Sequence, residues 1–145
     1  MSSLDPDGLA ARLRDSGLRV TAPRLAVYAA VAAHPHADAE QVATVVRARL
    51  GAISTQAVYD VLKVLTQQDL LRRIEPAGSP ARYETRTGDN HHHVICRLCG
   101  VTGDVDCAVN VTPCLEASNP QGFVIDEAEV TYWGRCPSCQ GTATP

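Results

Sequence analysis

The sequence predicts an α+β protein in two parts, a mainly helical N-terminal half and a small C-terminal half that combines strands with a short helix. Three observations support this prediction. Four helical patterns with capping residues follow one another between residues 7 and 65. Two short basic strands come next, at residues 70–75 and 81–84. Two Cys-x-x-Cys pairs then span a compact C-terminal region, and we place the boundary between residues 1–84 and 85–145.

The composition fits one compact domain or two small ones in a chain of 145 residues. Hydrophobic residues make up 45% of the chain but aromatic residues only 4%, so the core is modest. Small domains with modest cores are often stabilised by a bound structural metal. No signal peptide opens the sequence, and no apolar run reaches membrane-spanning length. We therefore expect a cytoplasmic protein with no membrane partner. Cysteines are reduced in that compartment, which favours metal binding over disulfides.

The net charge of −3 is unevenly distributed along the chain. Residues 1–84 contain ten Lys/Arg and nine Asp/Glu, whereas residues 85–145 contain three and seven. The basic side chains are therefore concentrated in the first half, and the metal-ligand candidates lie mostly in the second.

Each of the four predicted helices has recognisable ends. Ser, Thr and Asp favour the N-cap position, and the N-caps that we expect are Asp7, Thr21, Asp38 and Ser54. Glycine and the residue before a proline end helices, and the ends that we expect are Gly17, His34-Pro35 and Gly51.

The fourth helix has one apolar and one polar face. The apolar side chains recur at helical spacing and are Val58, Val61, Leu62 and Leu65. The polar face consists of Gln56, Tyr59, Asp60 and Lys63. Such a face is by itself typical of any helix exposed to solvent.

The two strands that follow change that interpretation. Short helices followed by a basic hairpin, with its turn at residues 76–80, predict a winged helix-turn-helix. The fourth helix would then enter the major groove of DNA, and Arg72, Arg73 and Arg82 would lie near phosphates. A helix-turn-helix used only for protein contacts is the alternative.

The C-terminal half is expected to be a small α/β domain. We predict strands at residues 91–96 and 101–105, a short helix at 112–117 and a long β-like run at 123–133. This run leads to the second cysteine pair. Because so small a half has few aromatic residues, we expect it to complete its core by pairing with a second copy, so that the protein is a homodimer.

The two Cys-x-x-Cys pairs predict a structural zinc site. Four thiolates suit a closed tetrahedral Zn²⁺ site, and the ligands are Cys96, Cys99, Cys136 and Cys139. Two separate redox pairs or inert thiols are the alternatives. Cys107 and Cys114 lie outside this motif, and we interpret them as inert buried thiols or as a redox pair.

Three consecutive histidines precede the first cysteine pair. Because the four-thiolate site is already full, they predict a second metal centre. His91 and His93 share one face of their strand, whereas His92 lies on the other. A zinc hydrolase built on His91, His93 and a carboxylate is an alternative, but the sequence contains no His-Glu-x-x-His element. A zinc-ribbon interaction module is another, against which the basic hairpin argues.

These motifs resemble the ferric-uptake-regulator family of bacterial metal- and redox-sensing repressors. The resemblance is carried by residues 17–21 with Arg24, 57–62, the hairpin, 91–100 and 132–139, which together span nearly the whole chain. Residues 54–60 and 104–107 with Cys114 are most similar to the actinobacterial FurA/CatR branch of peroxide-responsive repressors. The resemblance implies a homodimeric repressor, not an enzyme, that binds inverted-repeat operator DNA and controls a catalase-peroxidase gene and its own. An iron- or zinc-uptake regulator on the same scaffold is the alternative.

The resemblance also implies the functional residues. A regulatory Fe²⁺ or Mn²⁺, replaceable by Zn²⁺ in vitro, would be held by His34, Glu84, His91, His93 and Asp104. Some family members have a third metal site, but Ala128 occupies the position of its histidine, so we expect His92 not to be a ligand. Together with the polar face of the fourth helix, the resemblance predicts DNA contacts at Arg19, Arg24, Thr55, Gln56, Tyr59, Lys63 and Arg72.

Overall fold

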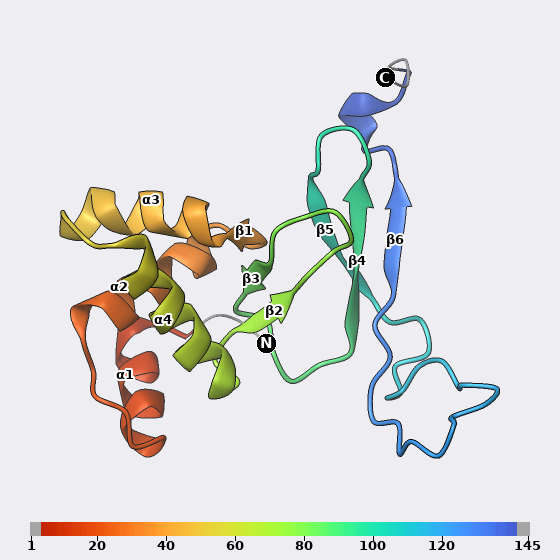
Figure 1. The fold of residues 1–145 in the computed structure, drawn as a ribbon, viewed down its shortest axis with the longest axis horizontal. Helices are drawn as coiled ribbons and strands as arrows, with labels where there is room; N and C mark the ends of the chain where they lie inside the picture. The colour runs from red at the N-terminus through yellow and green to blue at the C-terminus, as the bar shows by residue number, and fades with distance from the viewer. Residues whose placement is uncertain (1–3, 142–145) are drawn as a thin grey trace. The chain divides into compact units, whose positions relative to one another are not determined.

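The computed structural model describes residues 4–141, which form two compact units. The first unit ends at Gly88 and the second begins at Asp89. The first contains four α-helices and a small sheet, and the second contains a sheet with long irregular connections (Figure 1). None of the helices in the described part of the chain is long and apolar enough to cross a membrane.

Four capped helices build the first unit, and three of the expected N-caps are confirmed. The helices are α1 (Pro6–Asp15), α2 (Ala22–Ala33), α3 (Ala39–Leu50) and α4 (Thr55–Gln67). Thr21, Asp38 and Ser54 accept hydrogen bonds from the first turns of α2, α3 and α4. The expected cap Asp7 is wrong, because α1 begins two residues earlier. Asp5 accepts from the Gly8 N–H at 2.7 Å, and Pro6 occupies the first helical position, where its missing N–H costs nothing.

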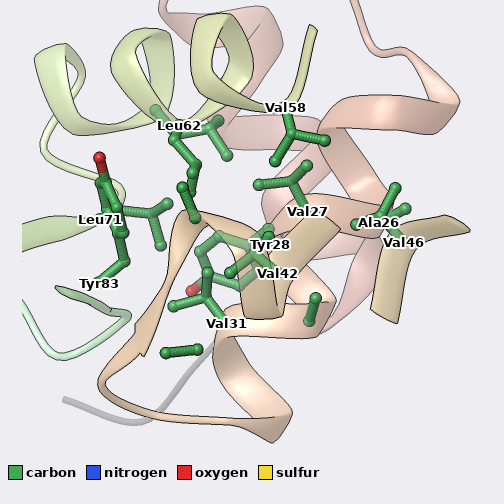
Figure 2. Packing of buried hydrophobic residues seen from close by; sticks show 14 of the residues in the cluster. Ala26, Val27, Tyr28, Val31, Val42, Val46, Val58, Leu62, Leu71 and Tyr83 are labelled. Carbon is green, nitrogen blue, oxygen red and sulfur yellow. The ribbon is translucent and has the colours of Figure 1, made fainter. Parts of the chain in front are cut away.

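The core of the first unit lies where α2, α3 and α4 meet (Figure 2). The predicted apolar face of α4 supplies Val58, Leu62 and Leu65, each fully buried, while Val61 packs at the edge. Side chains from α2 and α3 close around them, so α4 is anchored by one face and leaves its other face to solvent.

A three-stranded antiparallel sheet completes the first unit. Its strands are β1 (Ala37–Asp38), β2 (Arg72–Ile74) and β3 (Arg82–Glu84), in the order β1-β3-β2. The hairpin of β2 and β3 was expected, although both strands are shorter than the patterns suggested. The two-residue β1 was not expected. It pairs Ala37 with Tyr83, and so brings the segment after α2 against the second hairpin strand.

The sheet of the second unit has the order β5-β4-β6. Its strands are β4 (His91–Cys96), β5 (Thr102–Asp106) and β6 (Thr131–Gly134). β4 pairs antiparallel with β5 and parallel with β6. Figure 1 shows the chain leaving this sheet between β5 and β6 in a long irregular excursion.

Two predictions for the second unit are wrong. Residues 112–117 form bends rather than a helix, since a Thr-Pro start without an apolar stripe gives the segment nothing to pack against. The expected run at 123–133 is a strand only over Thr131–Gly134, the part that pairs with β4. Phe123 and Val124 are 75% and 98% exposed, so the earlier part has neither a partner strand nor a core in this chain.

Candidate metal centres and nucleic-acid interface

The four cysteines of the Cys-x-x-Cys pairs converge at one end of the second sheet. Because β4 and β6 run parallel with Cys96 opposite Gly134, the turn after each strand reaches the same place. The second turn is the short 3₁₀ helix η1 (Pro137–Cys139). The sulfur atoms of Cys96, Cys99, Cys136 and Cys139 all lie within 4.8 Å of one another, and the Cys99–Cys136 pair is 3.7 Å apart. A zinc tetrahedron with Zn–S bonds of about 2.3 Å has sulfur–sulfur edges of about 3.8 Å, so these residues fit the ion.

The electrostatics of this cluster also suit a divalent cation. Backbone N–H groups of Cys136 and then Cys99 donate to Cys96 Sγ and lower the pKa of Cys96 to about 6. The Cys136 N–H lies 3.4 Å from that sulfur. The neighbouring thiols, first that of Cys136, raise the pKa of Cys139 to about 12. One thiolate is thus stabilised by the backbone, whereas a full set of four needs a cation to offset their repulsion.

In the first unit, a histidine and a buried carboxylate face each other. His36 Nε2 lies 3.1 Å from Glu84 Oε2, and Glu84 is only 2% exposed. The β1–β3 pairing positions the two groups, since the His36 N–H donates to the Tyr83 carbonyl at 2.9 Å. The predicted ligand His34 instead forms the C-cap of α2 and is exposed. The structure therefore brings His36, and not His34, to Glu84.

In the second unit, two histidines converge on one carboxylate. His93 on β4 is paired with Asp104 on β5, and their side chains approach to 3.5 Å from Nε2 to Oδ1. His91 lies two residues along the same face, with Nε2 3.7 Å from the same oxygen. The two rings are 4.9 Å apart between centroids. Three of the predicted ligands of the regulatory metal are therefore gathered on one sheet.

A further residue at this cluster was not foreseen. Asp89 Oδ1 lies 2.7 Å from Nδ1 of the fully buried His91. A carboxylate in this place accepts a hydrogen bond from Nδ1–H and so favours the tautomer in which Nε2 carries no proton, which is how carboxylates orient metal-binding histidines. Its place two residues before His91 in the sequence is the signal that would have revealed it.

His92 points to the opposite side of β4 from its neighbours. Its Nδ1 accepts from the Val130 N–H at 3.3 Å, and its Nε2 lies 3.2 Å from Cys114 Sγ. The ligand atoms of His92, Cys107 and Cys114 lie within 4.8 Å of one another. These two thiols are potential ligands beside His92 that the sequence pattern did not reveal. The irregular path of residues 107–114 brings the two thiols together, which an unbroken helix would have kept apart.

The polar face of α4 lies on the surface of the first unit. Gln56, Tyr59, Asp60 and Lys63 are exposed, with Tyr59 at 45%. Gln56 Nε2 donates to Asp60 Oδ1 at 2.9 Å, so the amide screens the carboxylate on this face. The Thr55 hydroxyl is engaged within the first unit, because it accepts a hydrogen bond from Arg47 Nη2 at 2.6 Å.

The predicted arginine contacts differ in their freedom to reach DNA. Arg19 is exposed in the connection before α2. Arg24 Nη1 donates to the Arg19 carbonyl at 2.6 Å and so braces that connection. Arg72 is 16% exposed, and its Nε lies 3.9 Å from Glu84 Oε1.

Comparisons with known proteins agree with these features. The chain is 60% identical over 139 residues to the transcriptional regulator FurA of Mycobacterium tuberculosis, covering 96% of this chain and 93% of that protein. It is also 60% identical over 121 residues to ferric uptake regulation protein 1 of Mycolicibacterium fortuitum, covering 83% and 75% of the two chains. These relatives are named as regulators, not enzymes.

Among solved structures, the ferric uptake regulator of Helicobacter pylori matches with a TM-score of 0.73 over 99% of both chains. At 19% identity this match shows a shared α+β fold. The family model described as the ferric uptake regulator family matches residues 15–132. The chain therefore belongs to the ferric uptake regulator family of transcriptional regulators.

Proposed function

We propose that this protein is a metal-dependent, peroxide-responsive repressor that binds inverted-repeat operator DNA as a homodimer. Its targets would be a catalase-peroxidase gene and its own gene. The observation that carries the metal dependence is the convergence of His91 and His93 on Asp104, with Asp89 orienting His91. Imidazoles with carboxylates suit Fe²⁺ or Mn²⁺ better than a thiolate site does.

The regulatory ion is proposed to take ligands from both units. His91, His93 and Asp104 would come from the second unit, and Glu84 with His36 from the first. His36 replaces His34 in this proposal because it is the histidine that lies against Glu84. An ion shared in this way would fix the angle between the units, and so would favour one arrangement of the DNA-binding surfaces.

The DNA-binding element is proposed to be α4 within a winged helix-turn-helix. Gln56 can pair with adenine, Tyr59 can reach a thymine methyl group or a phosphate, and Lys63 can contact guanine or a phosphate. Arg19 and Arg24 would hold the backbone and set the register on the duplex. Arg72, beside Glu84, is expected to contribute less than the exposed groups.

The second unit is proposed to be the dimerisation domain, with the four-cysteine zinc site holding its two ends together. It has little core of its own, since Ile95 and Cys96 are its only buried hydrophobic residues among those the structure describes. Val94 and Tyr132 are paired neighbours on β4 and β6, yet they are 40% and 50% exposed. An apolar sheet face of this kind is well suited to a second copy.

Peroxide sensing is proposed to act through the regulatory metal. Fe²⁺ held by these residues would supply the electrons that reduce peroxide and so would place a strong oxidant beside them, whereas Mn²⁺ would do so far less readily. Oxidation of His36, His91 or His93 would remove a ligand and weaken metal binding. The alternative function, regulation of metal uptake, is favoured by the name of the Mycolicibacterium fortuitum relatives.

A mobility-shift experiment tests this function. Binding to an inverted-repeat operator is expected with Mn²⁺ or Fe²⁺ and not after their removal, with the zinc content held constant. Peroxide is expected to release DNA from the Fe²⁺ form and not from the Mn²⁺ form. Release by neither form would favour the uptake regulator, and binding without any added metal would contradict both.

A further inference from the structure

Three potential metal ligands meet on the face of β4 that the regulatory metal does not use. His92 Nε2 lies 3.2 Å from Cys114 Sγ, and Cys107 Sγ joins them within 4.8 Å. His92 is 3% exposed, and the two cysteines are half-buried. The segment that carries the cysteines is held beside the start of β4, because the side chain of Asn90, the residue before this strand, donates to the Val111 carbonyl at 2.6 Å.

The turn at Cys107 has the same pattern of backbone donors as the zinc-binding turn at Cys96. At Cys96, the N–H groups two and three residues later, of Leu98 and Cys99, donate to the sulfur. At Cys107, the N–H groups of Val109 and Asn110 stand at the same spacing and donate in the same way. A residue with positive φ follows in each turn, Gly100 at 76° four residues after Cys96 and Asn110 at 54° three residues after Cys107. The two backbone N–H groups that each turn directs at its sulfur favour a thiolate at Cys107 as they do at Cys96.

We propose that His92, Cys107 and Cys114 form a further Zn²⁺ site, distinct from both the four-cysteine cluster and the regulatory metal. Two thiolates and a neutral imidazole carry two negative charges, which Zn²⁺ neutralises, whereas Cu⁺ would leave one negative charge in a half-buried place. Three protein ligands leave the fourth tetrahedral position of zinc open to water or to another ligand.

Zinc binding to His92 is expected to change the hydrogen bond between the Val130 N–H and His92 Nδ1. The Val130 N–H donates to His92 Nδ1, so the proton of the neutral ring lies on Nε2 and faces Cys114. Binding of zinc through Nε2 requires that nitrogen to lose its proton, and Nδ1 then carries one. The 3.3 Å contact from Val130 to Nδ1 must therefore break or lengthen when the site fills.

The first test is a zinc titration of the full-length protein under reducing, oxygen-free conditions, with a chelator as competitor. The double variant Cys107→Ser/Cys114→Ser is expected to bind one equivalent fewer per chain than the wild type. Ser118→Ala, an exposed change in the same irregular segment, is the matched control and is expected to keep the wild-type number. Because the other two metal sites are unaltered in both variants, the difference reports this site alone.

The second test needs no variant. Addition of the last equivalent of zinc to wild-type protein is expected to protect Cys107 and Cys114 from alkylation and to shift the amide resonance of Val130. Equal zinc numbers in wild type and double variant, or alkylation that the last equivalent does not slow, would overturn the proposal. A disulfide between Cys107 and Cys114 that forms under the same reducing conditions would overturn it as well, in favour of a redox pair.

Discussion

His34 and His36, which flank one proline, have different environments in this chain. His34 lies at the end of α2 with an exposed side chain, whereas His36 adopts a positive φ of 68° and turns its ring toward Glu84. The resemblance implied His34 as the ligand, but both histidines flank Pro35 and no local pattern separates them. The distinction depends on the pairing of Ala37 with Tyr83 across β1 and β3, a long-range contact that local patterns do not contain.

This difference gives a matched pair of variants. His36→Ala is expected to weaken Mn²⁺ binding to the regulatory site by about 10–100-fold, the effect typical of losing a ligand or its close partner. His34→Ala, two residues away and exposed, is expected to leave it unchanged. Titration calorimetry of both variants with Mn²⁺ measures the two affinities. If His34→Ala weakens Mn²⁺ binding and His36→Ala does not, the ligand is His34.

The convergence of the four cysteines could be predicted from their spacing alone, because each pair lies in a local turn after a strand. Removal of one ligand is expected to cost much of the binding free energy, which for structural zinc is about 10–16 kcal/mol. That is comparable to the whole stability of a small domain. Cys99→Ser is therefore expected to lose zinc and to unfold the second unit, and not merely to lower its stability slightly.

Zinc content and thermal melting measure this effect. Ser138→Ala is the control, since Ser138 is exposed and lies between two ligands without contributing one. A Cys99→Ser protein that retains stoichiometric zinc and melts like the wild type would contradict the assignment.

At the scale of elements, the helices of the first unit were predictable and the second unit was less so. Capping residues and an apolar stripe occur together in α2, α3 and α4, so local preference and packing agree. At residues 112–117 a capping pattern occurs without a stripe, and no helix forms. At residues 123–130 apolar residues occur without a partner strand, and no strand forms. The predicted helices and strands are therefore found where a core within the chain supports them.

The exposed face of α4 leads to a prediction about DNA. Tyr59→Ala is expected to weaken operator binding while leaving non-specific binding intact, because Tyr59 lies on the exposed face of α4 that we propose reads the bases. Arg19→Ala is expected to weaken all DNA binding and to reduce the salt slope by about one unit, since it would remove one of the proposed phosphate contacts. The brace from Arg24 persists in this variant because it uses the backbone carbonyl of residue 19.

Binding measured by fluorescence anisotropy at several salt concentrations separates the two effects. Gln67→Ala, exposed at the end of α4, serves as a control that alters neither. Unchanged operator affinity in both the Tyr59 and Arg19 variants would remove α4 as the reading helix.

At the scale of the whole molecule, apolar surface is concentrated in the second unit. Among residues 4–141, the large hydrophobic side chains of the first unit that are exposed are only Leu50 and Tyr59. Those of the second unit are Val94, Val101, Val109, Val111, Leu115, Phe123, Val124, Ile125 and Tyr132. This distribution supports a dimer built through the second unit, which the scarcity of aromatic residues had already suggested.

A charge on the apolar sheet face tests that dimer. Val94→Asp is expected to shift the protein toward monomer, because it places a carboxylate beside Tyr132 in the proposed interface. Asn119→Asp, which adds the same charge at an exposed polar position of the second unit, is expected to leave the dimer intact. Sedimentation velocity over a range of concentrations measures both, and a Val94→Asp protein that remains fully dimeric would exclude this face.

The final prediction concerns the trigger of the whole switch. Peroxide is expected to add one oxygen atom to the peptides that contain His36 or His91 and His93, in the Fe²⁺ form only, because the oxidant arises at the metal within reach of its ligands. The competing trigger is a disulfide between Cys107 and Cys114, whose sulfurs already lie close enough to share a metal. Peptide mass measured after treatment of the Fe²⁺ and Mn²⁺ forms separates the two, with operator binding followed in the same samples. Cys107→Ser/Cys114→Ser is the matched variant, and it is expected to keep the iron-dependent response. The histidine trigger would be wrong if the histidine peptides stay unmodified while Cys107 and Cys114 become linked and DNA is released with either metal. The trigger would then be the oxidation of these two thiols.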